Sequence, residues 1–106
     1  MASGQNGQSF AFNGYLPVKP PERVRAIRHF EKRAQTENQA QIFIETPYRN
    51  LRLFEELIRT CNENTRLTIA ADLLQSDQLI RTERIAAWKN KTPDIHKRPT
   101  IFILGV

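Results

Sequence analysis

The sequence contains one cysteine, Cys61, among its 106 residues, and this excludes both an intramolecular disulfide and a metal cluster held by cysteines. The expected compartment is therefore a reducing one, the cytoplasm. No apolar run approaches the length that spans a membrane, so no membrane partner is expected. Only four glycines are present, and none forms a glycine-rich phosphate loop of either common spacing.

Side chains that could carry chemistry are equally sparse. His29 and His96 have no cysteine or carboxylate at ligand spacing, so no metal site is expected. Glu45 and Asp72 could form a carboxylate pair across neighbouring strands, but nothing marks them as acid and base. Cys61 lies near a helix end among apolar residues and is expected in the core. No catalytic residue is assigned, and the chain alone does not have the sequence of a complete enzyme.

Basic residues outnumber acidic residues in the chain. The net charge is +5 and the pI about 9.9, which favours a polyanionic partner, RNA in the first place. The cations cluster before and within a segment of helical spacing, at Lys19, Arg23, Arg25, Arg28, Lys32 and Arg33. Clustered cations bind phosphates without special spacing. A solvated helix face explains the same cluster equally well.

Apolar periodicity predicts a layered α/β domain in the order β-α-β-α-β-β-α-β, with about five strands and helices packed on them. The expected strands cover roughly 10–15, 42–44, 67–71, 79–82 and 100–106, and the expected helices 22–35, 47–62 and 83–90. The run 42–44 shows no polar alternation and is expected to be buried on both sides. Trp88 is expected to be a core anchor.

The stretch "QIFIETPYRN" ends a strand abruptly in a polar elbow at Glu45 and Thr46. Ligand sites of open α/β sheets lie beyond the carboxyl ends of the strands, where such polar steps occur. The simpler interpretation is a helix cap, with Thr46 as N-cap and Pro47 in the first helical position. Spacing alone favours the cap.

Two motifs together resemble the carboxy-terminal half of the tetrapyrrole methylase superfamily, whose members are S-adenosylmethionine-dependent methyltransferases. Its branch that methylates a ribose 2′-hydroxyl of small-subunit ribosomal RNA is the most similar. That branch has a Phe-x-Gly-Phe-Leu-Pro-x-Lys segment, matched by "FNGYLPVK" from Phe12 to Lys19. Its Glu-Ser/Thr-x-x-Arg elbow is matched by Glu45, Thr46 and Arg49. "RLTIAADLL" and "RPTIFILG" resemble its later strands.

The resemblance implies a two-domain enzyme that binds S-adenosylmethionine in the cleft between its domains. Residues 1–9 would be the end of an amino-terminal domain and its linker, and residues 10–106 the carboxy-terminal α/β domain. The implied cofactor contacts are Glu45, Thr46, Ala71, Leu73 and Thr100. Contacts to RNA are expected at Lys19, Arg23, Arg25 and Arg49, from their basic character as much as from the similarity. A catalytic base, where one is needed, is expected on the other domain, and homodimers are common among such methylases.

The segment "QSDQLIRTERIAAW" departs from the ribosomal RNA branch, because it is shorter and lacks that branch's Lys-x-x-Glu segment and glycine-containing turn. The methylated substrate therefore stays open. Two other functions remain: a stand-alone RNA-binding or regulatory module without catalysis, and a small interaction domain whose charge only keeps it in solution.

Overall fold

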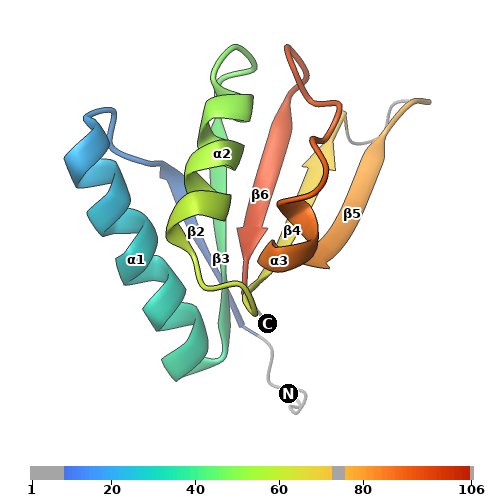
Figure 1. The fold of residues 1–106 in the computed structure, drawn as a ribbon. Helices are drawn as coiled ribbons and strands as arrows, with labels where there is room; N and C mark the ends of the chain where they lie inside the picture. Colours follow the sequence, from blue (N-terminus) through green and yellow to red (C-terminus); the bar gives the residue numbers. More distant parts are fainter. Residues whose placement is uncertain (1–8, 73–75, 106) are drawn as a thin grey trace.

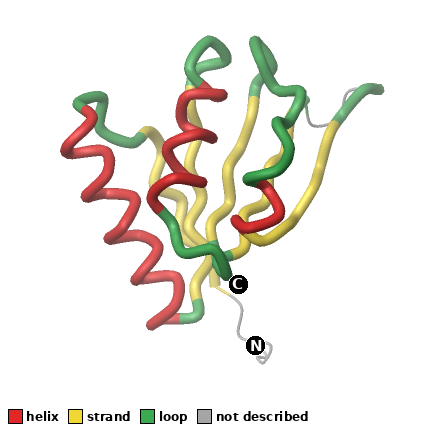
Figure 2. The backbone as a smooth tube through the Cα atoms, viewed as in Figure 1, coloured by secondary structure: helices red, strands yellow, loops and turns green. Residues whose placement is uncertain are grey.

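The computed structural model describes residues 9–72 and 76–105, which form one five-stranded sheet with three helices on one of its faces (Figures 1 and 2). The elements follow the expected order and are β2 (Ser9–Tyr15), α1 (Pro20–Glu37), β3 (Gln39–Glu45), α2 (Asn50–Thr60), β4 (Arg66–Ala71), β5 (Leu79–Arg84), α3 (Ile85–Trp88) and β6 (Thr100–Leu104). The expected layered α/β class with five strands is confirmed.

The strand order is β2-β3-β6-β4-β5. β2 pairs with β3 in parallel, and the other three pairings are antiparallel. β6 lies between β3 and β4, so Thr100 at its start pairs with both Glu45 and Ala71. The ends of β2, β3 and β4 and the start of β6 therefore meet at one edge of the sheet, called here the carboxyl edge, at the top of Figure 1.

The core lies between the sheet and the helices. Phe43, Phe102 and Ile69 project from neighbouring strands to the helix face and are fully buried there. The indole N–H of Trp88 donates to the carbonyl of Leu67 over 2.9 Å, which satisfies the polar atom of this large buried side chain. Trp88 as a core anchor and Cys61 as a buried residue are both confirmed.

The opposite face of the sheet carries no helix (Figure 1). Alternation along β3 places Ile42 and Ile44 on this open face, where both are half-buried. Phe10 and Phe12 on β2 share the face and are largely exposed. The expectation that β3 is buried on both sides is therefore wrong within this chain, because all three helices pack on the same side.

The starts of all three helices differ from expectation. α2 begins at Asn50 with Arg49 as its N-cap, three residues later than predicted, so Thr46 is not the cap. α3 is a single turn of four residues, because residues 83 and 84 extend β5 instead of starting the helix. α1 begins earlier, at Pro20, with Pro21 next to it in the first turn.

Candidate functional site

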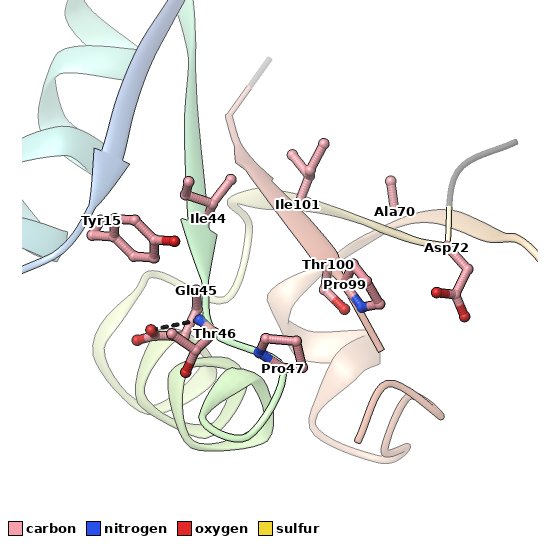
Figure 3. Close-up of a pocket in the computed structure, with 10 residues that line it drawn as sticks. All are labelled: Tyr15, Ile44, Glu45, Thr46, Pro47, Ala70, Asp72, Pro99, Thr100 and Ile101. Atoms are coloured by element: carbon pink, nitrogen blue, oxygen red, sulfur yellow. Dashed lines mark hydrogen bonds between the residues drawn. The ribbon is translucent and has the colours of Figure 1, made fainter. Parts of the chain in front are cut away.

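A pocket of about 450 Å³ lies at the carboxyl edge and opens toward the uncovered side of the sheet (Figure 3). Four strand ends build it, those of β2, β3 and β4 together with the start of β6. Its lining residues are Tyr15, Ile44, Glu45, Thr46, Pro47, Ala70, Asp72, Pro99, Thr100 and Ile101. We call it the edge pocket.

Tyr15 reaches the edge pocket because of an irregularity in β2. The register with β3 shifts between Phe12 and Gly14, and Gly14 has a φ of 66°. This bulge inserts one residue, so Tyr15 pairs with Ile44 on the open face instead of turning toward the helices. A glycine suits the position, since a side chain would strain the left-handed backbone.

The elbow after β3 is a turn and not the first turn of a helix. The N–H of Arg49 donates to the carbonyl of Thr46 over 2.9 Å. The N–H of Thr46 donates to Oε1 of Glu45 over 2.8 Å, the bond drawn in Figure 3. Because no helix cap uses the Thr46 side chain, its exposed hydroxyl stays at the rim of the edge pocket.

Glu45 is buried and paired. Its Oε2 lies 3.2 Å from a guanidinium nitrogen of Arg23, whose Nε is 2.5 Å from Oε1 of Glu56 on α2. The side chains of Arg23 and Glu45 are only 4% and 6% exposed. Arg23 thus joins α1, β3 and α2 from the inside. The expectation that Arg23 contacts RNA is corrected, because its guanidinium is buried between the carboxylates of Glu45 and Glu56.

Asp72 ends β4 in a left-handed conformation, with φ 51°, and its N–H donates to the carbonyl of Pro99 over 2.9 Å. Its carboxylate accepts a 2.6 Å hydrogen bond from Nε of Arg98, which raises the pKa of Arg98 above its ordinary value. Both carboxylates of the edge pocket, Glu45 and Asp72, are therefore paired with an arginine, and Glu45 shares its arginine with Glu56.

Asn50 holds the wall formed by the start of β6. Its side-chain amide donates to the carbonyl of Ile95, to that of Arg98 over 2.8 Å, and to Oγ1 of Thr100 over 3.3 Å. The Thr100 hydroxyl in turn donates to the carbonyl of Arg98 over 2.8 Å. Asn50 is fully buried beneath the pocket. Sequence reasoning missed it, since a single polar residue at a helix start gives no signal of such a role.

The structure brings together three of the residues expected to contact the cofactor, Glu45, Thr46 and Thr100. Ala71 does not line the pocket. Alternation turns its side chain toward the helices, and its neighbour Ala70 takes the place on the open face. Leu73 lies outside the described residues.

The remaining expected RNA contacts, Lys19, Arg25 and Arg49, are exposed. Among residues 9–72 and 76–105, no three histidine, cysteine, aspartate or glutamate side chains gather where a metal ion could be held. Nor does any helix in that part of the chain have the length and apolar character needed to cross a membrane.

No model of a known protein family matches the chain. The chain is 27% identical over 106 residues to "Ribosomal RNA small subunit methyltransferase I" of Buchnera aphidicola subsp. Schizaphis graminum (strain Sg), a match that covers 97% of this chain. The resemblance to methyltransferases of the tetrapyrrole methylase superfamily is confirmed. The chain spans only 36% of the length of that relative.

A solved structure shares the fold. The crystal structure of the methyltransferase CobJ superposes with a TM-score of 0.52 over 92% of this chain and 41% of its own, at 16% sequence identity. At that identity the likeness concerns the fold alone. Again the match covers less than half of the longer protein.

Proposed function

We propose that this chain is the carboxy-terminal domain of an S-adenosylmethionine-dependent methyltransferase that acts on RNA, and that the edge pocket holds the adenosine part of the cofactor. In this proposal residues 10–106 form the domain and residues 1–9 lead in from an amino-terminal domain. The observation that carries it is the meeting of Glu45, Thr46 and Thr100, which the sequence resemblance implied as cofactor contacts, at one pocket of the sheet.

The pocket suits a flat apolar ring with a few polar neighbours. Its volume of about 450 Å³ lies within the usual range for small-molecule sites. Ile44, Ala70 and Ile101 make its floor apolar, and Tyr15 and Thr46 add an aromatic ring and a hydroxyl at the rim. Because Glu45 and Asp72 are already paired with arginines, neither would leave an unpaired charge beside a bound adenine.

When bound, S-adenosylmethionine supplies a methyl group that can pass to an oxygen of the substrate. The part of this chain is to orient the cofactor and exclude water on one side, and positioning of this kind contributes much of the rate of such a transfer. Both carboxylates of the edge pocket are engaged. A base, where the reaction uses one, would therefore come from another part of the protein.

RNA is the favoured substrate class. The relative's name specifies small-subunit ribosomal RNA, and the net charge of +5 favours a polyanion. Lys19, Arg25 and Arg49 are exposed and available for phosphates. A ribosomal RNA substrate would place the protein in the cytoplasm, which agrees with a free, buried cysteine.

The test is Thr46→Arg in the complete protein, because the added guanidinium would fill the edge pocket from its rim. S-adenosylhomocysteine binding, measured by calorimetry, should be lost while the circular dichroism spectrum is unchanged. Thr36→Arg, at an exposed position of α1 away from the pocket, should bind as the wild type does. Equal affinity of Thr46→Arg and wild type would show that the cofactor is not in this pocket. RNA binding by a wild-type protein with no cofactor affinity would instead indicate a module without catalysis.

A further inference from the structure

A second pocket, of about 480 Å³, lies between the start of α1 and the length of α2. Its charged lining consists of Arg23, Arg49, Arg52, Arg59, Glu55 and Glu56. We call it the arginine pocket. We propose that it binds neighbouring backbone phosphates of the RNA substrate, an assignment that rests on the function proposed above and extends it to Arg52 and Arg59.

Three of the four arginines are available to a ligand. Arg49, Arg52 and Arg59 are exposed, and within the described part of the chain they form no ion pair. Arg52 and Arg59 stand seven residues apart, two helical turns, so they share one face of α2 and span about 10 Å along it. Arg49 precedes them at the N-cap.

The acidic residues of the pocket do not cancel this charge. Glu56, four residues after Arg52, is drawn inward to Arg23 at 2.5 Å and is largely buried. Glu55 has the helical ion-pair spacing to Arg59, yet the described residues show no pair between them. On an ordinary solvated helix face, Arg52 would pair with Glu56 and Glu55 with Arg59, since each pair is four residues apart. Here the buried network removes Glu56 as a partner of Arg52, and Glu55 forms no ion pair within the described residues.

The choice of side chain indicates a phosphate. Guanidinium groups are planar, permanently charged and weakly hydrated, and they grip a phosphate with two parallel hydrogen bonds. Backbone amides of α1 do not provide this affinity, because Pro20 and Pro21 lack an N–H and the N–H of Arg23 donates to the carbonyl of Lys19. The arginine side chains are the charged donors that line the pocket. The positive ends of both helices lie at the same edge and add to the attraction (Figure 1).

Position favours the nucleic acid over a free anion. Arg23 lines the arginine pocket and Glu45 lines the edge pocket, and these two residues are 3.2 Å apart. One buried ion pair thus separates the two pockets. A strand whose ribose reacts beside the cofactor held in the edge pocket would have its neighbouring phosphates close to the arginines, whereas a free anion gains nothing from this adjacency.

The experiment measures binding of a short, fluorescently labelled single-stranded RNA to the complete protein by anisotropy, at about 50 and 200 mM salt. Arg52→Gln/Arg59→Gln should weaken binding about tenfold or more at the lower salt. It should also reduce the slope of log affinity against log salt by about 1.4, the share of two phosphate contacts. Arg52→Lys/Arg59→Lys keeps the charge without the planar fork and should fall between this variant and wild type.

The matched control is Arg66→Gln/Arg84→Gln, which removes the same charge from two exposed arginines outside the pocket. It should weaken binding no more than about threefold, as expected when only the general field changes. Equal losses in the two glutamine variants would overturn the pocket assignment, since RNA would then respond to net charge alone. Calorimetric binding of inorganic phosphate that depends on Arg52 and Arg59, with RNA affinity unchanged in the variant, would overturn RNA as the ligand. The proposed methyltransferase function fails separately, by absence of cofactor binding in the wild type.

Discussion

Replacing Arg23 by methionine tests the buried network on which both pockets rest. The substitution keeps most of the side-chain volume and removes the charge that Glu45 and Glu56 share. Their side chains are 6% and 13% exposed, so water can solvate neither one well. Removing one partner of a buried ion pair costs about 3–5 kcal/mol, because the remaining charge is left uncompensated. At a urea m-value of about 2 kcal/mol/M, the midpoint should fall by about 2 M.

Two further variants make this measurement decisive. Arg25→Met lies on the same helix at an exposed position and should change the stability by no more than about 0.5 kcal/mol. Arg23→Met/Glu45→Gln/Glu56→Gln removes all three charges and retains an oxygen for the Thr46 N–H, so it should recover most of the loss. If the triple variant were as unstable as Arg23→Met alone, unpaired carboxylates would not be the cause. Equal stability of Arg23→Met and Arg25→Met would refute the buried network itself.

Three other predictions concern the core, the backbone and the ligand. Gly105→Ala should destabilise the chain by about 2–4 kcal/mol in urea unfolding, because the new Cβ would lie 2.6 Å from Cβ of Ala34 at a φ of 99°. Gly14→Ala, where the added Cβ meets nothing within 4 Å and only the positive φ is strained, should cost about 1 kcal/mol; equal losses in the two would contradict this packing. Burial raises the pKa of the Cys61 thiol, so a thiol reagent should label it only as fast as the chain unfolds; rapid labelling in native buffer would contradict the buried position. The chain by itself should bind S-adenosylhomocysteine weakly or not at all, since the chain covers about a third of the relative it matches, and tight calorimetric binding would show that the edge pocket suffices.

Periodicity predicted the central elements because they bury a clear apolar face. In α2, Leu53, Phe54 and Leu57 recur at helical spacing and are buried in the structure. The run Leu67–Ala71 is short, apolar and bounded by polar residues, and it became β4 with one residue added at its start. Such local patterns predict secondary structure correctly where packing in the folded chain favours the same helix or strand.

The sequence alone does not show which distant strands pair in the sheet. Nothing local says that β6 inserts between β3 and β4, and this insertion brings Thr100 beside Glu45 and Ala71. The same limitation explains the exchange of Ala71 for Ala70, because an error of one residue in a strand moves a side chain to the other face. Arg23 was misjudged for a related reason. Its partners Glu45 and Glu56 come from two other elements, and a helix read alone cannot show that one of its cations points inward.

The polar end of β3 now has a physical explanation that goes beyond capping. Glu45 projects to the helix face, where a lone carboxylate would be costly, and Arg23 and the N–H of Thr46 compensate it. In this arrangement the elbow is a turn, α2 starts at Asn50, and the Thr46 hydroxyl lies at the edge pocket. Glu56 completes the network from α2, and in doing so it leaves Arg52 unpaired at the surface. Arg23 therefore contributes to both pockets. It pairs with Glu45 in the wall of the edge pocket, and it holds Glu56 away from Arg52 of the arginine pocket.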